Sequence, residues 1–338
     1  MAHIVAESDI VEFEGFEDVV DRVLLRKATS FLEELQAELA PTTPAFRSPS
    51  MFSTKLRHGL EFRHAEVTVW AGYNGHRKSM FTSQVSLDLL AQGQRVMLAS
   101  FEMEPVKTLA RMCRQAWGTK TPTAAQIQVF ANWTNGKLWI FDHIGRIQPS
   151  KVLAMSRYFQ DEMMGHHVVI DSMMMVCRSE ESLDEQKQFT TDLVRMVQET
   201  KLHAHLVAHC RKPQSGKEDT PPSKYDLRGS AAISDQAHNV VTIWANKAKK
   251  AKLESGVCSS DTLAEPDALV SMEKQRNGQW EGRCKLWFDE SSLRFCDDGV
   301  SAVEPYAKLV SAWEGISTHA GLAHATPAPA RDLSAAHA

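Results

Sequence analysis

Short apolar runs alternate with longer amphipathic ones between residues 66 and 295, and this alternation constrains the fold of the 338-residue chain more than any other feature. The short runs have the length of strands and lie at 67–72, 95–100, 137–142, 167–172, 204–209, 239–245, 267–274 and 284–289. Helical patterns lie between them, at 79–91, 105–117, 149–164 and 183–202. Strands that alternate with helices predict an α/β fold, with a mostly parallel central sheet flanked by helices.

Composition narrows the class of protein. Hydrophobic residues make up 43% of the chain, and no stretch approaches the ~18 apolar residues that a membrane span needs. The acidic start lacks the features of a secretory signal, so we expect a cytoplasmic protein without a membrane partner. The six cysteines form no C-x-x-C pair, which argues for reduced thiols. A net charge of -4 means that any contact with nucleic acid must come from local patches.

The ends of the chain differ from its middle. Residues 1–54 predict a helical arm and a linker, because an amphipathic pattern ends at PTTPAFRSPS. This arm either packs on its own domain or docks on a neighbouring subunit. Residues 55–298 form the expected catalytic domain, and 299–338 an Ala/Pro/His-rich tail that we expect to be disordered. Within the domain, 211–225 and 246–266 are expected to be loops or partly disordered.

A candidate phosphate site follows the first predicted strand. A glycine-bearing loop with Lys78 and Ser79 leads directly into a helix, which is the context of a P-loop. Lys78 would neutralise the β- and γ-phosphates, and the Ser79 hydroxyl would bind Mg²⁺. Arg77 departs from the usual pattern, which has glycine immediately before the lysine. The expected nucleotide contacts are Gly72, Asn74, Gly75, His76, Arg77, Lys78, Ser79 and Met80.

Three further polar residues lie at or just after the ends of predicted strands. Asp171 has the form of a Walker B carboxylate, which holds Mg²⁺ through water, although a strand-terminal Asp is often a cap or turn residue. Glu102 could deprotonate an attacking water, or be an ordinary polar residue at a strand exit. His209 could donate a hydrogen bond to the γ-phosphate. Ligands of open α/β sheets bind at such carboxyl ends. A zinc site at His203, His205, His209 and Cys210 is disfavoured, because only His209 ends its strand.

The segments AGYNGHRKS, SFEM, VVIDS, VAHCRK, YDLRGSAAISDQAHNVV and MEKQRNG occur in this order. Together they resemble the RecA-like P-loop NTPase motor of replicative hexameric DNA helicases, of the bacterial DnaB type and the phage primase-helicase type. The resemblance covers residues 52–295, and its most specific pieces are 226–241 and 273–278. Two departures are Arg77 and a short N-terminus, in which neither a primase half nor a globular N-terminal helicase domain is visible.

The resemblance implies ATP and Mg²⁺ as cofactors and a role for each matching residue. Lys78 and Ser79 match the P-loop lysine and the Mg²⁺ ligand, Glu102 the catalytic base, Asp171 the Walker B acid and His209 the γ-phosphate sensor. Lys274 and Arg276 match the pair that reaches the γ-phosphate of the neighbouring subunit. Arginine fingers contribute about 10³ to 10⁵ in rate. Action in trans implies a homo-oligomer, and the resemblance suggests a hexameric ring in a bacterial cell or a phage-infected host.

The resemblance also implies that single-stranded DNA is bound by the segment after His209. Arg211 and Lys212 lead into a loop, and Arg228, Gly229, Ser230 and Ala231 open a helix. Contacts to the DNA backbone give little sequence preference and a strong salt dependence. A separate primase or helicase loader is an expected further partner. We therefore expect an ATP-dependent replicative helicase motor.

Two alternatives remain open at this point. The first is a recombinase or circadian-type ATPase on the same fold, which the EKQRNG segment disfavours. The second is a weakly hydrolysing, ATP-gated DNA-binding or loading scaffold, which Arg77 in the P-loop favours. A large gain in turnover on Arg77→Gly would favour the scaffold, and no gain would favour the motor.

Overall fold

The computed structural model describes residues 28–32, 36, 49, 51–57, 59–177, 182–213, 218–229, 231–307 and 309–311. The chain divides into two compact units, Met1–Arg47 and Ser48–Ala338. The described part of the first unit is the 3-10 helix η2 (Ala28–Phe31) with Leu32 and Gln36, which are exposed. The rest of the expected helical arm lies outside the described residues, so the arm and linker assigned to 1–54 stay a prediction.

The second unit holds the sheet and the helices around it. Its described elements are, in chain order, α3 (Thr54–Arg57), β1 (Val67–Gly72), α4 (Lys78–Ala91), β2 (Val96–Ser100), α5 (Pro105–Trp117), α6 (Ala124–Thr134), β3 (Leu138–Ile140), α7 (Pro149–Met163), β4 (His167–Asp171), α8 (Met173–Val176), α9 (Leu183–Thr200), β5 (His203–His209), η3 (Lys224–Asp226), α10 (Ala232–Gln236), β6 (Asn239–Ala245), α11 (Lys247–Glu254), α12 (Ser260–Ala264), β7 (Ala268–Gln275), β8 (Arg283–Asp289) and β9 (Arg294–Cys296). No helix among the described residues combines the length and the apolar character needed to cross a bilayer.

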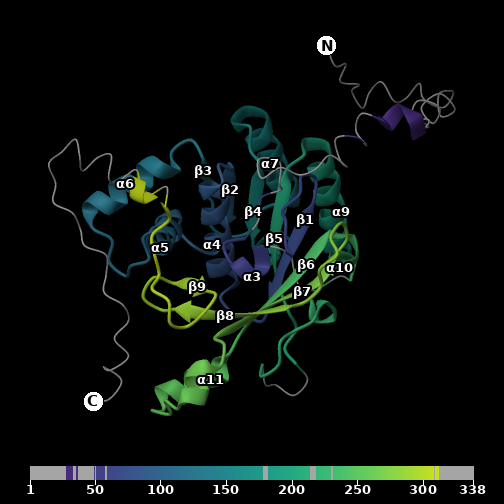
Figure 1. Cartoon of the computed structure of the whole chain (residues 1–338). Coiled ribbons are helices and arrows are strands. Elements are labelled where there is room, and N and C mark those ends of the chain that lie inside the picture. Colours follow the sequence, from purple (N-terminus) through teal and green to yellow (C-terminus); the bar gives the residue numbers. More distant parts are fainter. Residues whose placement is uncertain are drawn as a thin grey trace, which may run out of the picture. The chain divides into compact units, whose positions relative to one another are not determined.

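The strands form one sheet in the order β3-β2-β4-β5-β1-β6-β7-β8-β9 (Figure 1). From β3 to β6 all neighbours are parallel, and β7, β8 and β9 add antiparallel pairs at one side. The expected mostly parallel α/β sheet is therefore confirmed. Because parallel strands end at the same edge, Gly72, Ser100, Asp171 and His209 come to one edge of the sheet.

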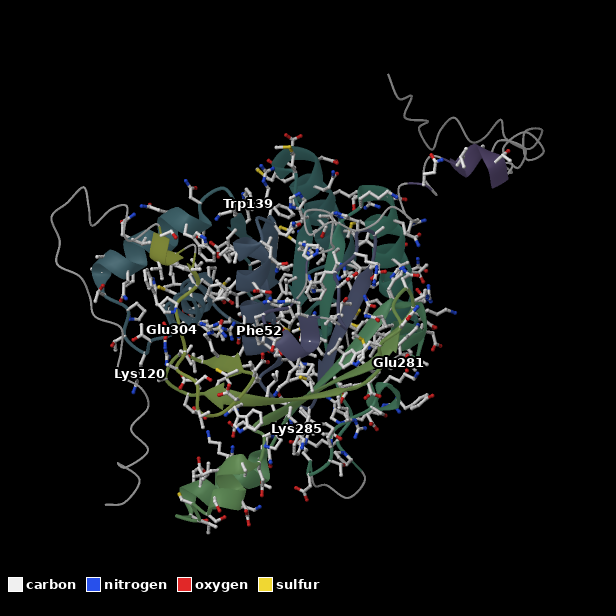
Figure 2. The ribbon with its side chains drawn as sticks, viewed as in Figure 1. Phe52, Lys120, Trp139, Glu281, Lys285 and Glu304 are labelled. Carbon is white, nitrogen blue, oxygen red and sulfur yellow. The ribbon has the colours of Figure 1, made fainter. Side chains whose placement is uncertain are left out.

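Helices cover both faces of the sheet, because side chains along each buried strand point alternately to the two faces. In β1, Trp70 belongs to the core that packs under α4 and α5, whereas Val69 and Ala71 belong to the core under α7 and α9. Phe52, labelled in Figure 2, extends the first core with an edge-on contact to Phe81 of α4. This two-sided burial fixes the position of the loop after β1.

Most predicted elements are confirmed. All eight predicted strands are present, as are the helices α4, α5, α7 and α9. The sequence analysis missed the helices α3, α6 and α8 and the short strand β9. The start of α6 carries a capping box, in which Thr123 and Gln126 satisfy each other's backbone N–H groups. That T-x-x-Q pattern was the available signal for this helix.

The loop expected at 246–266 is a correction, because the segment forms the helices α11 and α12. The side chain of Asn246 accepts a hydrogen bond from the N–H of Lys249 and so caps α11. Lys249 is buried, pairs with Asp267 at 2.8 Å and donates to the carbonyl of Glu265. A run of lysines indicates a solvated loop, but here one lysine holds the two helices against the start of β7.

The segment after β9 is ordered further than expected. Tyr306 donates its N–H to the carbonyl of Ala116 in α5, and the Arg294 guanidinium lies over its ring at 5.0 Å. Leu309 is fully buried in the same core. The disordered tail expected from residue 299 thus begins with residues that pack on the second unit. Residues 312–338 lie outside the described residues.

Candidate nucleotide site

The loop between β1 and α4 has the backbone geometry of a phosphate-binding loop. A Cβ atom at Gly72 would collide with the carbonyl oxygen of Ile243 in β6, so glycine is required there. Gly75 has a φ of 74°, in the left-handed region that glycine adopts readily. α4 begins at Lys78, and the first N–H groups of a helix have no partner within it. These N–H groups are available to an anion.

Arg77 adopts the backbone conformation that a glycine would otherwise provide. Its φ is 62° and its ψ is 23°, which is left-handed. The guanidinium lies over the ring of Phe288 at 3.9 Å and donates to the Glu290 carboxylate at 2.9 Å. The side chain is therefore held by β8 and the turn after it. The loop keeps its shape at a cost of about 1–2 kcal/mol for a left-handed residue with a side chain.

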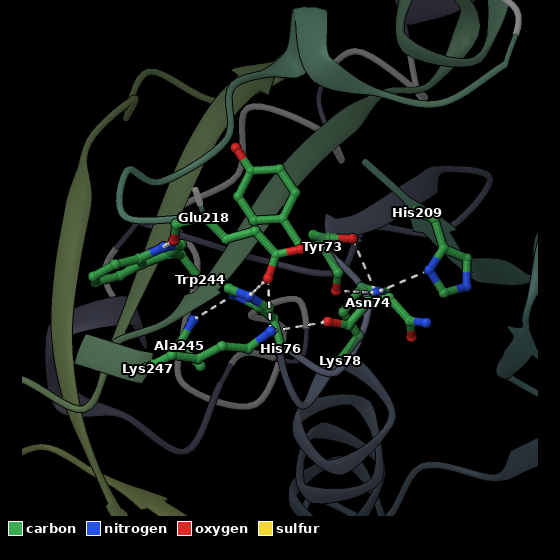
Figure 3. A network of polar contacts seen from close by, with 10 residues as sticks. Tyr73, Asn74, His76, Lys78, His209, Glu218, Trp244, Ala245 and Lys247 are labelled. Atoms are coloured by element: carbon green, nitrogen blue, oxygen red, sulfur yellow. Dashed lines mark hydrogen bonds and ion pairs between the residues drawn. The ribbon is translucent and has the colours of Figure 1, made fainter. Parts of the chain in front are cut away.

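Lys78 is the buried cation of the site (Figure 3). Its ammonium donates to the carbonyls of Gly72 at 2.9 Å and Tyr73 at 2.8 Å, and faces His209 Nδ1 at 3.3 Å. Burial lowers the pKa of Lys78 to about 8, and the pKa of His209 to about 4. At neutral pH the lysine is charged and the histidine is neutral, with Nδ1 as its acceptor and the proton on Nε2.

Two carboxylates lie close to this lysine. Burial raises the pKa of Asp171, and the nearby Ser79 hydroxyl opposes this shift. Glu102 is exposed, and its Oε1 accepts from the Ser172 hydroxyl at 2.8 Å. Both carboxylates interact electrostatically with Lys78. The structure thus brings together the predicted residues Lys78, Ser79, Glu102, Asp171 and His209.

Arg111 is a residue that the sequence analysis missed. It lies in α5, is 8% exposed, and its positive charge lowers the pKa of Asp171. With Ser79 and Asp171 it lines a small cavity between α4, α5 and β4. The available signal was a polar residue on the buried face of an amphipathic helix, where Thr108 and Gln115 also lie. Burial lowers the pKa of Arg111, but it stays a cation.

The remaining loop residues divide between the tip and the walls. Asn74 and Gly75 are exposed at the tip. His76 is fully buried, and its ring bonds to Glu218 and to the backbone of Ala245. Its backbone is therefore the part that can face a phosphate. Met80 is half-buried in α4, and its carbonyl accepts from Gln115.

The expected DNA-contacting residues follow β5. Arg211 and Lys212 are exposed, and Arg211 reaches the carbonyl of Gly229 at 3.3 Å. Arg228 is half-buried, and its N–H donates to the carbonyl of His209 at 2.8 Å. Gly229 has a φ of 107°, and a side chain there would collide with Gln186 of α9. Ser230 lies outside the described residues, and Ala231 precedes α10, which is the expected helix.

Lys274 and Arg276 lie apart from the other site residues. The N–H of Arg276 donates to the carbonyl of His238 just before β6, whereas the N–H of Ala245 at the other end of β6 donates to His76. β6 has seven residues, so these two ends are about 20 Å apart. Lys274 and Arg276 instead bind carbonyls at the end of α10. They are not brought to the Lys78 of their own chain.

The residues 55–297 match the family described as the DnaB-like helicase C terminal domain. The chain belongs to this family. It is accordingly an ATP-hydrolysing helicase motor with a RecA-like fold, which favours the helicase interpretation over the recombinase-type one.

Two solved structures are similar to this chain. The first, described as an ATPase domain, is 16% identical with a TM-score of 0.63, and the match covers 82% of this chain and 98% of that chain. The second is a DnaB-like replicative helicase, described with its interactions with primase. It is 16% identical with a TM-score of 0.67, and the match covers 86% of this chain and 73% of that chain. At this identity the two structures support the fold.

Proposed function

We propose that this chain hydrolyses ATP with Mg²⁺ at the interfaces of a homo-oligomeric ring, with six subunits, and thereby moves along single-stranded DNA and unwinds duplex. One observation carries the proposal. Lys78, Glu102 and His209 meet at one edge of the sheet, whereas Arg276 lies about 20 Å away at the other end of β6. A single copy of the chain therefore does not bring Arg276, the expected arginine finger, to its own phosphate site.

The residues around Ser79 suit Mg²⁺, which prefers oxygen ligands and keeps several waters. The Ser79 hydroxyl and the Asp171 carboxylate line the same small cavity, so these two residues would hold the ion. Arg111 offsets part of the carboxylate charge from the side of α5. When bound, Mg²⁺ neutralises charge on the β- and γ-phosphates.

The hydrolytic water is assigned to Glu102. Ser172 donates to Oε1 of this carboxylate, which fixes its orientation and leaves Oε2 to take a proton from water. The positive charge of Lys78 stabilises the phosphates. When nucleotide binds, the hydrogen bonds from the Lys78 ammonium to two loop carbonyls are replaced by bonds to phosphate oxygens. His209 presents Nε2–H as a neutral donor, because its Nδ1 faces Lys78. Such a donor can bind the γ-phosphate and change its contacts when phosphate leaves.

The nucleoside has a fitting cavity beside the loop. A cavity of about 610 Å³ extends from Arg77 to Phe288 and is walled by α11, α12 and the segment after β9. An aromatic ring and several apolar side chains suit a purine base, and the wall also carries charges of both signs, among them Lys250 and Glu290. We assign the base and ribose of ATP to this cavity.

The DNA contact is assigned to Arg211, Lys212, Arg228, Gly229, Ser230 and Ala231. The N–H of Arg228 donates to the carbonyl of His209, and the charge of Arg228 lowers the pKa of that histidine. A change at the γ-phosphate can therefore reach Arg228 through one residue. A separate primase or loader, and a cytoplasmic location, stay predictions that belong to this proposal.

The proposal is tested by measuring ATP hydrolysis with and without single-stranded DNA. We expect DNA to stimulate the wild-type chain, and Glu102→Gln and Arg276→Ala each to lower turnover at least about 100-fold. Arg283→Ala, which removes an exposed arginine from the neighbouring strand β8, is the matched control and should change little.

Mixing the two inactive variants tests the composite site. An interface that takes Glu102 from one subunit and Arg276 from the next regains activity in mixed rings, whereas a site within one chain regains none. A wild-type chain that binds ATP but hydrolyses none in the presence of DNA would favour the weakly hydrolysing scaffold instead.

A further inference from the structure

Glu218 is attached to the nucleotide loop by its side chain and to β6 by its backbone (Figure 3). Its Oε2 accepts from His76 Nε2 at 2.9 Å and from Lys247 Nζ at 2.6 Å. Its carbonyl accepts from the Trp244 indole N–H at 2.8 Å. Residue 218 is therefore held at two points by β6, α11 and the phosphate loop.

The bond from His76 has a fixed direction. The backbone N–H of Ala245 donates to His76 Nδ1 at 3.0 Å, so Nδ1 is the acceptor and the proton lies on Nε2. Nε2–H then donates to the Glu218 carboxylate. The ring is fully buried and has an edge-on contact with Tyr73. Because both nitrogens are bonded and the ring is enclosed, His76 cannot turn away without breaking the link.

Lys247 joins the same link from the other side. Besides its ion pair with Glu218, its Nζ contacts the carbonyl of Asn74 at 3.4 Å and lies above Gly75. Both residues belong to the tip of the phosphate loop. Phosphate charge bound in the loop would attract Lys247 and repel Glu218, so it acts on the two partners in opposite directions.

Glu218 also belongs to the stretch that carries the expected DNA contacts. The two ends of that stretch are tied to each other, since the N–H of Arg211 donates to the Asp226 carbonyl and that of Arg228 to the His209 carbonyl. Glu218 lies between these ends and is the described acidic residue that reaches back to the phosphate loop. The stretch is thus joined to the nucleotide site by His209 at its base and by Glu218 further along.

We propose that Glu218 is a positioning residue that couples occupancy of the phosphate loop to DNA binding by the segment after β5, through His76 and Lys247. This rests on the proposed function. Residue 76 occupies an unspecified position in the G-x-x-x-x-G-K-[ST] pattern, so the link is a property of this chain's own residues. Coupling of this kind is reciprocal: nucleotide changes DNA affinity by the factor by which DNA changes nucleotide affinity.

The test measures that factor on the full chain. The affinity for a fluorescent oligo-dT strand is measured with and without a saturating non-hydrolysable ATP analogue, for wild type, Glu218→Gln and Glu218→Ala. Allosteric factors are typically about 5 to 150. We expect the wild-type factor to fall to within about twofold of one in Glu218→Ala, and to an intermediate value in Glu218→Gln, which keeps an acceptor for His76 but loses the charge that Lys247 binds.

Two further measurements separate positioning from a general structural role. Turnover without DNA should stay within about twofold of wild type in both Glu218 variants, since Glu218 contacts no reacting group. Combining His76→Gln with Glu218→Ala should reduce the coupling factor no further than Glu218→Ala alone, because both substitutions break the same link. Glu265→Gln is the matched control, because it neutralises a carboxylate bonded to Lys252 away from the loop.

Each result decides the proposal. A Glu218→Ala chain that keeps the wild-type factor overturns it, and so does one that loses basal turnover or nucleotide binding, because Glu218 then supports the site itself. If nucleotide does not change the DNA affinity of the wild-type chain and DNA does not change its turnover, the proposed function is refuted. This inference is then refuted with it.

Discussion

Strand β5 has histidines near both of its ends, and the two ends have different roles. His203 and His205, at the start, are 0% and 1% exposed and pack among Phe62, Trp70 and His167. His209, at the end, is half-buried and faces the Lys78 ammonium. The same residue type thus serves the core at one edge of the sheet and the nucleotide site at the other.

Hydrogen bonds fix the buried histidines as neutral rings. The Trp70 indole donates to His205 Nδ1 at 3.2 Å, so His205 carries its proton on Nε2 and donates it to His167 Nδ1. His203 donates Nδ1–H to the carbonyl of Arg63, and its Nε2 accepts from Thr68. The nitrogens that accept these bonds need the neutral form, whereas the bond from His203 to the Arg63 carbonyl favours the charged one. These rings are structural, and only a histidine at the strand's carboxyl end can meet a ligand.

The largest expected effects come from removing a histidine at one end of β5 or at the other. We expect His209→Ala to lower DNA-stimulated turnover by about 100-fold, because a donor aimed at developing charge is typically worth 10² to 10³. His205→Ala should instead destabilise the fold by about 2–4 kcal/mol, through a cavity and an unpaired indole N–H. Turnover per folded molecule and urea unfolding, measured on both variants, check this contrast.

The contrast fails in either of two ways. If His205→Ala, assayed well below its melting temperature, loses turnover as strongly as His209→Ala, the buried cluster takes part in the chemistry. If His209→Ala shifts unfolding as much as His205→Ala, His209 is part of the core.

Acid should lower the stability of the fold through the buried histidines at the start of β5. Burial lowers the pKa of His203 to about 3, and the pKa values of His167 and His205 also fall well below the usual range. Between pH 6.5 and 3, His203 binds more protons in the unfolded chain than in the folded one. The contribution of His203 to the free energy of unfolding is therefore present above pH 6.5 and is lost as the pH falls. From pH 6.5 to 5 the loss is about 2 kcal/mol for this residue.

Urea unfolding at pH 7 and pH 5 measures that loss. His203→Gln keeps hydrogen-bonding groups without titrating, so the difference in stability between the two pH values should shrink by about the same 2 kcal/mol. An unchanged difference in His203→Gln would mean that other groups cause the acid sensitivity.

The sequence predicted the strands and the phosphate loop because their signals are local. Alternating apolar runs specify each strand, and Gly72, Lys78 and Ser79 are close together in the chain. Arg111, Glu218 and the ordered α11 escaped prediction because their positions depend on partners far along the chain, such as Asp171, His76 and Asp267. A motif identifies which residues touch a ligand, whereas the side chains that hold those residues come from tertiary contacts.

A smaller effect, which depends on pH, is expected at Lys78 in the nucleotide site. Burial lowers the pKa of Lys78 to about 8 in the free site, and phosphate binding favours its charged form. Nucleotide affinity should therefore be level below pH 8 and weaken by about tenfold per pH unit above it. Titrating a fluorescent ATP analogue from pH 7 to 9.5 tests this. Lys78→Arg, which stays charged, should bind with no such slope, and an equal slope in both proteins would point to another group.

The smallest effect is expected at Arg77, where the scaffold alternative predicts a large one. Arg77→Gly relieves the left-handed backbone by about 1–2 kcal/mol. It also removes the contacts with Glu290 and Phe288, each worth up to about 1 kcal/mol at a partly exposed site. These terms nearly cancel. The loop already has its phosphate-binding shape, so turnover should change by less than about threefold.

Arg77→Ala sharpens this comparison, since it loses the same contacts without relieving the backbone. It should be less stable than both wild type and Arg77→Gly, by about 1 kcal/mol or more, while its turnover also stays near wild type. A gain of ten-fold or more in Arg77→Gly alone would show that the arginine restrains hydrolysis. The chain would then act chiefly as an ATP-gated scaffold, and the left-handed arginine would be the reason.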